Sequence, residues 1–581
     1  MNIFNILQYV LFLGIIVALV KPVGIYLELV FSGKRTFLDP VMRPLERFIY
    51  RLAGVDERQE MDWKQYALSF VLFGFCGTLL LYLILRIQPV LHTFDPAFLP
   101  APLTPDLAMN TAISFATTTT WQAYGGETTL SYFNQLVGLA AQNFLAGAAG
   151  LAVGIAFIRG LARERSKTLG NFWVDMVRAI LWVLLPISVV GSLILVWQGV
   201  PLNFNHYQSV PLLQVTSDAQ GKPVITQVLP MGPVAALEFI KNLGTNGGGF
   251  FNVNGAHPYA NPTPLSNLVA MLAIAVLPAS LTYTFGRMVG HTRAGWVLFW
   301  VMFVLFVLGL VIGTWAEQRG NPRIAALGVD NSITNTQSGG NMEGKETRFG
   351  IGGSILAAIT TSNGATGSYN SMYDSYSPIG GAVVIVNMML GEIVFGGLGT
   401  GLYSIILVSL VGLFVGGLMV GRTPEYLGKK ISITEMKLIV LYALVAPIIT
   451  LPLTALAVLT PAGLAGLTTN GGAHGLSEIL VAYTTSMANN GLNFAGLSVN
   501  TPFYNITTAV AMWAGRFGMG VLALALAGMF AQQGRKPVTM GTMPTDTVLF
   551  GVIVIGTALI VGALSYFPVL ALGAFVEHLL L

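Results

Sequence analysis

Long apolar runs recur from one end of the chain to the other, and they restrict its fold more than any other feature. The first is Ile3–Phe31, and about nine more follow, each long enough to cross a bilayer as a helix. Only 9% of the residues are charged, whereas about 25% is usual for a soluble domain. The sequence therefore predicts an all-α polytopic membrane protein, with about ten transmembrane helices in a single transmembrane domain over 1–581.

Basic residues gather in a few of the segments between these runs, and they predict which side each segment faces. Lysines and arginines cluster within 34–64, 159–178, 287–293, 422–437 and 535–536. Because such clusters favour the cytoplasmic side, both the N- and C-termini are predicted to lie outside. The net charge of +4 is small and spread over short loops, so it does not indicate binding to nucleic acid.

One order of parts recurs four times along the chain: a span, a short apolar helix, a polar turn and a second span. The predicted repeats are 66–158, 180–285, 296–421 and 438–529, with one extra span at each end, over 1–31 and 547–570. Non-helical backbone at membrane depth is tolerated only where it is buried in protein or lines a water-filled path. Four such turns, all on the outer side, predict a pseudo-fourfold ring of carbonyl oxygens around a dehydrated cation, as in potassium filters.

The polar turn within Leu243–Asn252, LGTNGGGFFN, supports this prediction most strongly, because Gly247–Gly249 leave the backbone bare. Taken alone, the stretch is equally consistent with a flexible loop between helices. A membrane scaffold without ion sites is a further interpretation, which the presence of four such turns disfavours. The predicted filter residues are Thr117, Thr118, Thr119, Thr120, Thr245, Asn246, Gly247, Ala365, Thr366, Gly367, Asn489, Asn490 and Gly491. The first turn thus lacks the glycine that the other three contain.

The apolar run over 380–421 is too long for one span, since about 20 residues suffice. Its middle contains Gly391, Gly396, Gly397, Gly399 and Gly401, and glycine is unfavourable inside a helix. We therefore predict two half-helices joined by an intramembrane loop beneath the filter. The alternative is a kinked span without a gating role.

Two charged residues fall inside apolar runs, Glu392 in this loop and Arg516 midway along the ninth span. Lone charges at that depth are costly and are usually paired or functional. The positions predict a direct Glu392–Arg516 pair below the filter. In the alternative, each charge separately faces a water-filled cavity.

Other polar side chains give weaker signals. The single cysteine, Cys76, is predicted to be a small packing residue. Histidines in the outer segments lack ligand spacing and are expected to be ordinary polar surface rather than metal ligands: His206, His257 and His474. Carboxylates flank the polar turns and are expected either to concentrate cations or to cap short helices: Glu127, Glu238, Asp374 and Glu478.

Several stretches carry a family resemblance. LGTNGGGFFN, TTTTWQ at Thr117–Gln122, ANNGLNFAGLS at Ala488–Ser498 and GRTPEYLGKKI at Gly421–Ile431 resemble the potassium-binding subunits of Kdp potassium-transporting ATPases. The wider pattern of four unequal pore loops is similar to the superfamily of Trk, Ktr and HKT potassium transporters. The resemblance covers essentially the whole chain. The chain departs from the pattern in its all-threonine first turn and in Thr366, which puts fine selectivity in question.

This resemblance implies a division of labour. The chain would bind K⁺ as the transported ion, would use no organic cofactor and would not be catalytic, because a P-type ATPase partner, KdpB, hydrolyses the ATP. The sequence agrees, since it contains neither a Walker A pattern nor a DKTG motif. KdpC, the small KdpF subunit and membrane lipid are the other implied partners, in the bacterial inner membrane.

The resemblance also implies a route. Ions would leave the filter sideways through an intramembrane tunnel, and the glycine-rich loop from Gly391 would act as a gate. Gln122 matches a family residue linked to potassium handling, although a pore-helix amide that bonds nearby backbone is the simpler interpretation. A stand-alone potassium channel or cation cotransporter of the same superfamily is the alternative function.

Overall fold

The computed structural model describes residues 3–90, 102–218, 220–334, 337–419, 421–422, 424–537 and 542–581. Within these residues, ten helical segments are long and apolar enough to cross a membrane, which confirms the prediction of a helical polytopic membrane protein. They are α1 (Ile3–Phe31), α3 (Trp63–Arg86), η2–α6 (Asn134–Ala162), α7–η3–α8 (Phe172–Trp197), α10 (Pro264–Met288), α11 (Thr292–Gln318), α15 (Thr400–Met419), α16 (Ile433–Leu459), α19–η6–α20 (Pro502–Gln532) and α21–η7–α22 (Val548–Leu579).

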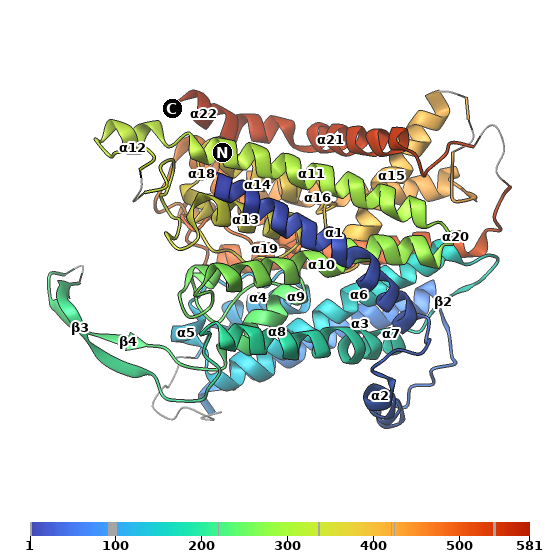
Figure 1. Ribbon diagram of the computed structural model, residues 1–581, viewed down its shortest axis with the longest axis horizontal. Helices are drawn as coiled ribbons and strands as arrows, with labels where there is room; N and C mark the ends of the chain where they lie inside the picture. The colour runs from blue at the N-terminus through green and yellow to red at the C-terminus, as the bar shows by residue number, and fades with distance from the viewer. Residues whose placement is uncertain are drawn as a thin grey trace.

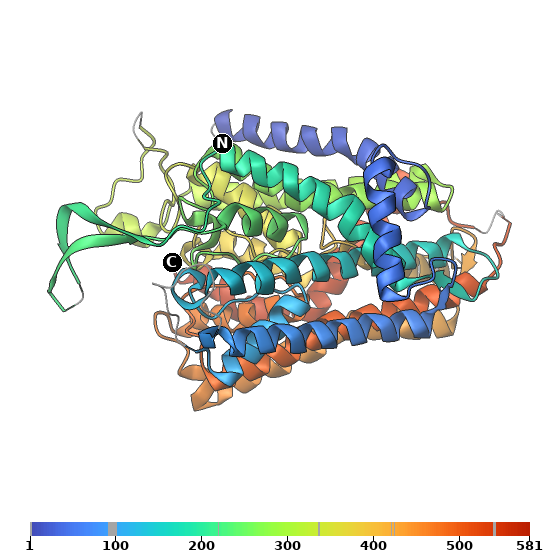
Figure 2. The same cartoon turned by 90° about the horizontal axis from the view of Figure 1, so that it is seen from below.

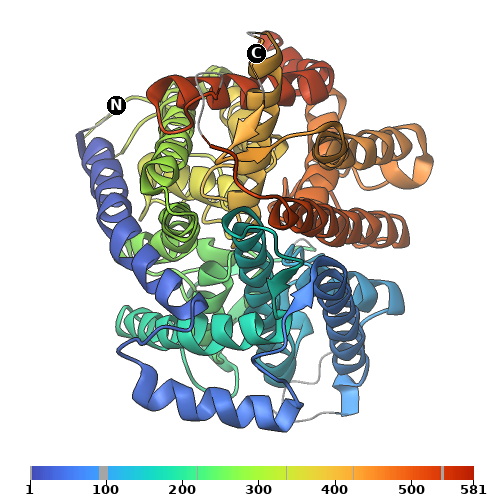
Figure 3. The ribbon, with the colours of Figure 1, turned by 90° about the vertical axis from the view of Figure 1, so that its right-hand side faces the viewer.

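The long helices run roughly along the longest axis of the molecule, and most appear end-on when that axis is viewed directly (Figures 1 and 3). Both chain termini lie toward the same end as the hairpin of β3 (Gln208–Ser217) and β4 (Pro223–Leu229), which we call the loop end. The opposite end carries α2 (Asp39–Ala53) and β2 (Thr168–Gly170), and we call it the basic end. The two termini therefore share one side, as an even number of spans requires.

Four short helices lie between the long ones, and each leads into a polar turn. They are α4 (Pro105–Ala116), α9 (Val234–Leu243), α13 (Gly350–Asn363) and α18 (Gly472–Ala488). Most of their residues are buried, including polar ones, so these helices do not face lipid. The recurring order of parts read from the sequence is present here, whereas the limits of each repeat as a unit stay a prediction.

The seventh apolar run is broken, as its glycines predict. α14 (Pro378–Met389) ends well before α15 begins at Thr400, and irregular backbone joins them. Gly391 and Gly399 adopt positive φ values of 79° and 85°, which favour glycine. Glu392 and Phe395 also have positive φ, at 55° and 44°, a conformation that is strained for residues with a Cβ and that persists only when the surroundings impose it.

Elements outside the spans were not expected from the apolar runs. The exposed hairpin β3–β4 projects from the loop end, and α2 lies across the basic end, nearly at right angles to the long helices (Figure 2). The remaining short helices are α5 (Gly126–Thr129), α12 (Pro322–Ala326), α17 (Pro461–Leu464), η1 (Gln88–Val90), η4 (Asn254–Ala256) and η5 (Tyr373–Ser375). Two further strand pairs are β1 (Met61–Asp62) with β2, and β5 (Glu425–Tyr426) with β6 (Lys429–Lys430).

Four of the long helices contain wider, π-helical turns. These are η2 (Asn134–Ala140), η3 (Ala179–Leu184), η6 (Ala514–Gly518) and η7 (Ala571–Phe575). Such turns occur often at functional sites, and η6 contains the buried Arg516.

The core of the bundle is packed around α6, most of which is buried, whereas α1, α16 and α21 present much of their apolar surface outward. Glycines allow close approach at this centre, as is common between membrane helices. A Cβ on Gly154 of α6 would lie only 2.5 Å from the Cα of Gly399 in the broken span. The expectation that Cys76 is a small packing residue is wrong for this chain by itself, because Cys76 is exposed on α3.

Candidate functional site: a ring of four polar turns

The four polar turns share one backbone conformation although their sequences differ. Just past the end of each short helix, one residue adopts a left-handed φ of 50–66°: Thr118, Thr245, Ala365 and Asn489. Two residues further on, a left-handed φ recurs in three of the turns, at Thr120, Gly247 and Gly491, but not at Gly367. The common conformation supports the pseudo-fourfold relation that the sequence suggested.

The turns also touch each other in cyclic order. The hydroxyl of Thr120 donates to the carbonyl of Asn246 over 2.7 Å, and the Gly367 N–H donates to the same carbonyl over 3.3 Å. A Cβ on Gly367 would lie 2.9 Å from the Cα of Gly491, and a Cβ on Gly491 would collide with the Thr119 carbonyl oxygen. The first turn therefore contacts the second, the second the third, the third the fourth, and the fourth the first.

Backbone N–H groups of the turns are bonded back to the short helices. The Asn246 and Gly247 N–H groups both donate to the Lys241 carbonyl, over 2.8 and 3.0 Å. The corresponding bonds in the other turns are Thr120 to Ser114 (2.9 Å), Thr366 to Thr361 (3.2 Å) and Asn490 to Thr485 (2.9 Å). With these N–H groups occupied, the turns offer carbonyl oxygens to a ligand, which suits a cation.

A buried polar network braces the second turn from behind. The Lys241 ammonium is completely buried and pairs with Glu238 over 2.8 Å. Lys241 also donates to Asn254, whose side-chain nitrogen donates in turn to the carbonyls of Gly248 and Gly367. The expectation that Glu238 concentrates cations or caps a helix is therefore wrong, because its charge is used inside the protein.

Two side chains from the segment after the first turn reach the second. The Gln122 side-chain oxygen accepts a hydrogen bond of 2.8 Å from the Gly249 N–H, which agrees with the simpler, bracing interpretation of this residue. Glu127 accepts a hydrogen bond of 2.9 Å from the Asn252 N–H, and burial raises its pKa above the usual range. Both contacts hold the second turn against the first.

A cavity of about 20 Å³ lies directly beneath the ring. The four left-handed residues, Thr118, Thr245, Ala365 and Asn489, all line it, and so do Gly397, Glu392 and Arg516. A volume of this size holds about one water molecule. The loop over 390–399 also borders the cavity, and its Leu398 N–H donates to the Thr245 hydroxyl over 2.9 Å.

The predicted direct pair between Glu392 and Arg516 is not formed, and no ion pair joins them within the described residues. The Glu392 carboxylate instead accepts a hydrogen bond of 3.0 Å from the Asn490 side chain in the fourth turn. Arg516 donates to the carbonyl of Ala146 in α6 over 2.8 Å. Both charges line the same cavity, which agrees with the alternative that each separately faces a cavity, while its filling with water stays a prediction.

Two further cavities adjoin this one in succession. One of about 40 Å³ shares Glu392, Thr400 and Asn489 with the cavity beneath the ring. The next, of about 80 Å³, shares Met389 and Gly391 with the second and is lined by residues of α14, α15, α16 and α21. The three cavities are therefore neighbours, and the third is lined by helices that include α16 and α21, which present much of their apolar surface outward.

Comparison with known proteins decides the family. The family model described as the potassium-transporting ATPase A subunit, KdpA, matches residues 10–579. This chain belongs to the KdpA family. The potassium-transporting ATPase potassium-binding subunit of Koribacter versatilis (strain Ellin345) is 50% identical over 581 residues, covering 98% of each chain. That of Methylobacterium nodulans is 51% identical over 572 residues, covering 98% of this chain and 97% of the relative.

The fold itself is shared more widely than the KdpA sequence. The crystal structure of the potassium transporter TrkH from Vibrio parahaemolyticus superposes with a TM-score of 0.51 at 12% sequence identity, covering 88% of this chain and 98% of TrkH. The resemblance to the KdpA family, read from the motifs, is thus confirmed, and the likeness to TrkH shows a shared fold.

Sequence reasoning missed residues of this KdpA-family chain that support the ring. Lys241 carried a signal, because it lies three residues after Glu238 in an otherwise apolar helix, a spacing that pairs opposite charges. Asn254 carried none, since its partner Gly367 lies more than 100 positions away and meets it only in the fold.

His474 is not the ordinary polar surface that was expected. Its two ring nitrogens contact Asp374 and Glu577, at 3.0 and 2.8 Å. Although burial opposes the charged ring, these two carboxylates raise the pKa of His474 to about 10.

Proposed function

We propose that this chain is the potassium-binding, channel-like subunit of an ATP-driven, high-affinity potassium uptake pump. It lies in the bacterial inner membrane with its loop end and both termini outside, and it hydrolyses no ATP. A P-type ATPase subunit, KdpB, supplies that reaction, and KdpC and KdpF complete the complex. The names of relatives about half identical over the full chain support this assignment.

The cyclic contact of the four turns is the observation that carries the proposal. Carbonyl groups of the residues predicted as the filter, from Thr117–Thr120, Thr245–Gly247, Ala365–Gly367 and Asn489–Gly491, replace the water around one K⁺ ion. Left-handed backbone in every turn and glycine at most of the closest approaches support this role. The buried bracing of Lys241 and Asn254 keeps the ring at one diameter.

From the ring, K⁺ enters the cavity beneath it and leaves sideways toward KdpB. The loop over 390–399 blocks the straight path, and its contacts with Thr245 and with Gly150 and Gly154 of α6 support that role. The positive Arg516 opposes straight passage of a cation, while Glu392 offers a carboxylate at the turn of the route. The succession of three cavities supports this lateral direction.

Substitution of Gly247 tests the filter. Gly247→Asp adds a carboxylate and a Cβ that would lie 2.6 Å from the Gly367 Cα, so K⁺ affinity falls by about tenfold or more and preference over Rb⁺ narrows. Gly416→Ala, in open space on α15, is the matched control. Wild-type affinity and K⁺-over-Rb⁺ preference in Gly247→Asp would exclude this ring as the filter.

Deleting part of the loop over 390–399 tests whether this loop blocks the straight path of K⁺. Deleting Gly396–Leu398 opens the straight path, so the complex leaks K⁺ without ATP. Unchanged passive K⁺ permeability of liposomes containing the folded deletion variant would show that the barrier lies elsewhere.

Dependence on an ATPase partner separates the pump from a stand-alone channel or cotransporter. The purified chain is reconstituted into liposomes with and without KdpB, KdpC and KdpF, and K⁺ flux is measured. The proposal expects uptake against a gradient only with the partner subunits and ATP. Rapid selective flux through the chain alone would favour the channel.

A further inference from the structure

Three metal-ligating side chains meet at the loop end, away from the ring of turns. Asp374 comes from η5, after the third turn, and His474 and Glu478 come from the first turns of α18. We propose that Asp374, His474 and Glu478, here called the His474 cluster, form a binding site for one divalent transition-metal ion of the Zn²⁺ type. This inference does not depend on the proposed route of K⁺.

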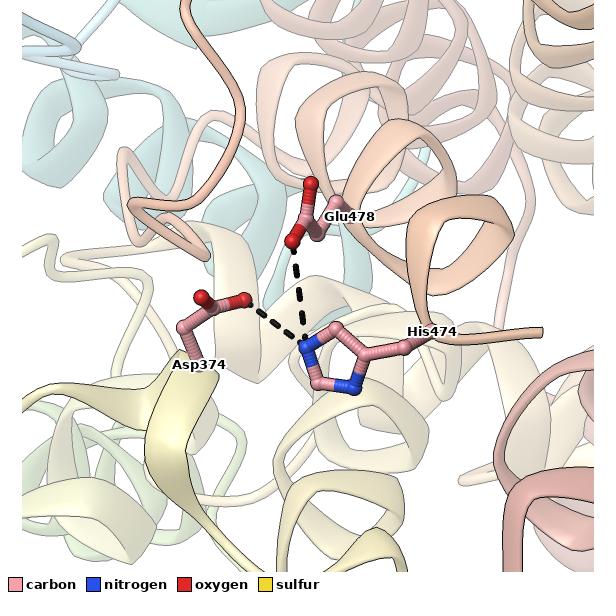
Figure 4. Close-up of side chains that lie close together, drawn as sticks. All are labelled: Asp374, His474 and Glu478. Atoms are coloured by element: carbon pink, nitrogen blue, oxygen red, sulfur yellow. Dashed lines mark hydrogen bonds and ion pairs between the residues drawn. The ribbon is translucent and has the colours of Figure 1, made fainter. Parts of the chain in front are cut away.

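The geometry of the cluster is that of a three-ligand site. The ring nitrogen Nε2 of His474 points at both carboxylates, 3.0 Å from Asp374 Oδ1 and 3.8 Å from Glu478 Oε1 (Figure 4). One ligand atom from each residue lies within 4.8 Å of the other two. Tetrahedral Zn²⁺ with bonds of about 2.0–2.1 Å separates its ligands by about 3.3 Å, so small side-chain shifts close the site.

His474 and Glu478 are four residues apart on one helix, which places both on the same face. The same spacing puts two ligands on one metal in helical zinc motifs. Asp374 then approaches from a different part of the chain, so the site is assembled only in the folded protein.

A further carboxylate orients the histidine. Glu577 in α22 contacts His474 Nδ1 over 2.8 Å. Glu577 keeps a proton on Nδ1 of His474. When the metal ion binds, it displaces the proton on Nε2, and the Nε2 lone pair then points toward the ion between Asp374 and Glu478. Metal-binding histidines commonly donate their other nitrogen to a carboxylate in this way.

The buried carboxylates lack sufficient positive charge of their own. The Glu478 side chain is 0% exposed and that of Asp374 is 7% exposed. Glu478 Oε1 accepts a hydrogen bond from the neutral Asn470 over 2.8 Å, while its other oxygen has no hydrogen-bond partner among the described residues. An imidazolium neutralises one of the three carboxylates, and a divalent ion compensates the remaining repulsion better.

The cluster is accessible from a cavity at the loop end. A Cβ on Gly496 would collide with Glu478 Oε1 and lie 2.5 and 2.6 Å from Thr469 Oγ1 and Asp374 Oδ2, so glycine at this position lets the two carboxylates come together. Asp374 and His474 line a cavity of about 520 Å³, along with Arg323, Glu343 and Glu577. The cavity supplies water for the fourth ligand position. A nitrogen ligand favours Zn²⁺ over Mg²⁺ or Ca²⁺, which prefer oxygen alone.

The site links three parts of the chain: the segment after the third turn, the start of the short helix before the fourth turn, and the C-terminal helix. An ion bound there stabilises their arrangement, because it binds the folded chain and not the unfolded one. Zn²⁺ is thus expected to raise the thermal stability of the full-length protein.

Direct binding tests the inference. The full-length chain in detergent at pH 7.5 is stripped with chelator and titrated with Zn²⁺ by calorimetry, and its melting temperature is recorded with and without the ion. We expect one Zn²⁺ per chain, a higher Tm with Zn²⁺, and loss of both effects in His474→Gln and Glu478→Gln. Glu577→Gln, which removes only the orienting partner, weakens Zn²⁺ binding about 10–100-fold.

His291→Gln, which alters an exposed histidine outside the cluster, is the control and keeps full binding. Gel filtration and the Tm without metal establish that each variant is folded, and Asp374→Asn replaces any variant that is not. Zn²⁺ binding that survives in the folded His474→Gln protein would overturn the assignment. So would stoichiometry well below one, or equal stabilisation by Mg²⁺ or Ca²⁺.

Discussion

The first and second turns of the ring reach the same backbone conformation by different means. The second turn has Gly247 at a φ of 96°, a conformation that glycine adopts without strain. Buried hydrogen bonds of Lys241 and Asn254 hold this turn in place. The first uses Thr120 at a φ of 51°, and its own side-chain and backbone hydrogen bonds, to Asn246 and Ser114, hold it there.

The first turn therefore keeps the backbone conformation of the ring although it lacks a glycine. A threonine in the left-handed region costs about 1–2 kcal/mol, and a net hydrogen bond returns about 0.5–1.5 kcal/mol. The two terms nearly offset each other. Glycine is required instead where a neighbouring turn leaves no room for a Cβ, as at Gly247, Gly367 and Gly491.

The largest expected effect comes from filling that room in the fourth turn. Gly491→Ala places a Cβ against the Thr119 carbonyl and forces alanine into a φ of 82°. Strain of about 1–3 kcal/mol together with the displaced carbonyl lowers K⁺ affinity by about 100-fold. The KM for K⁺ of the ATPase activity of the proposed complex measures this. A KM within twofold of wild type would show that the turns need not touch.

A smaller effect is expected from the bracing of the second turn. Gln122→Ala removes the acceptor of the Gly249 N–H and leaves that group unpaired, at a cost of about 1–3 kcal/mol. The KM for K⁺ rises by about tenfold, while Gln122→Glu, which keeps the acceptor oxygen, retains most of the affinity. If Gln122→Glu is as damaged as Gln122→Ala, the amide acts on the ion and not through Gly249.

Giving the first turn a glycine at position 120, as the second turn has at Gly247, has a still smaller effect on the KM for K⁺. Thr120→Gly relieves the backbone strain but loses the hydrogen bond to Asn246, so the KM for K⁺ changes by about threefold or less. Thr120→Val, which keeps the Cβ and loses only the hydroxyl, is the sharper comparison and is the worse of the two. Equal values for both would mean that the hydroxyl does not hold the turn.

Much of this architecture could be predicted because it follows from length and composition. Apolar runs of about 20 residues specify spans, and the five glycines between Gly391 and Gly401 specify the break in the seventh run. The position of each polar turn after a short helix also followed from local sequence. Contacts between turns could not be predicted, because they join residues more than 100 positions apart, such as Thr120 and Asn246.

The predicted Glu392–Arg516 pair, which is not formed, shows what the sequence cannot predict. A residue's place in a span fixes its depth but not the direction of its side chain. Arg516 lies in the π-helical turn η6, which changes the angular position of the residues around it, and it bonds to Ala146 instead. The cluster of Asp374, His474 and Glu478 was missed for a related reason, since Asp374 joins it only through the fold.

The smallest expected effect is a change in stability with pH, caused by a histidine that packs beside the second turn. His257 stacks on Phe251, which follows the glycines, with ring centroids 3.8 Å apart. Burial first, and the positive charge of Arg348 second, lower the pKa of His257 from 6.5 to about 4. Acidification therefore acts on the support of the second turn through this ring.

Between about pH 6.5 and pH 4 the unfolded chain binds a proton at His257 that the folded chain does not. Stability therefore falls as the pH falls through this window. Because the ring is only half-buried, solvent screening limits the loss to about 1 kcal/mol or less at pH 5. His257→Gln removes this proton uptake, so its Tm falls less between pH 7 and pH 5 than the Tm of wild type. His291→Gln, an exposed histidine at the end of the following span, keeps the wild-type slope. Parallel Tm curves for wild type and His257→Gln would show that the stacked ring does not control the acid response of the second turn.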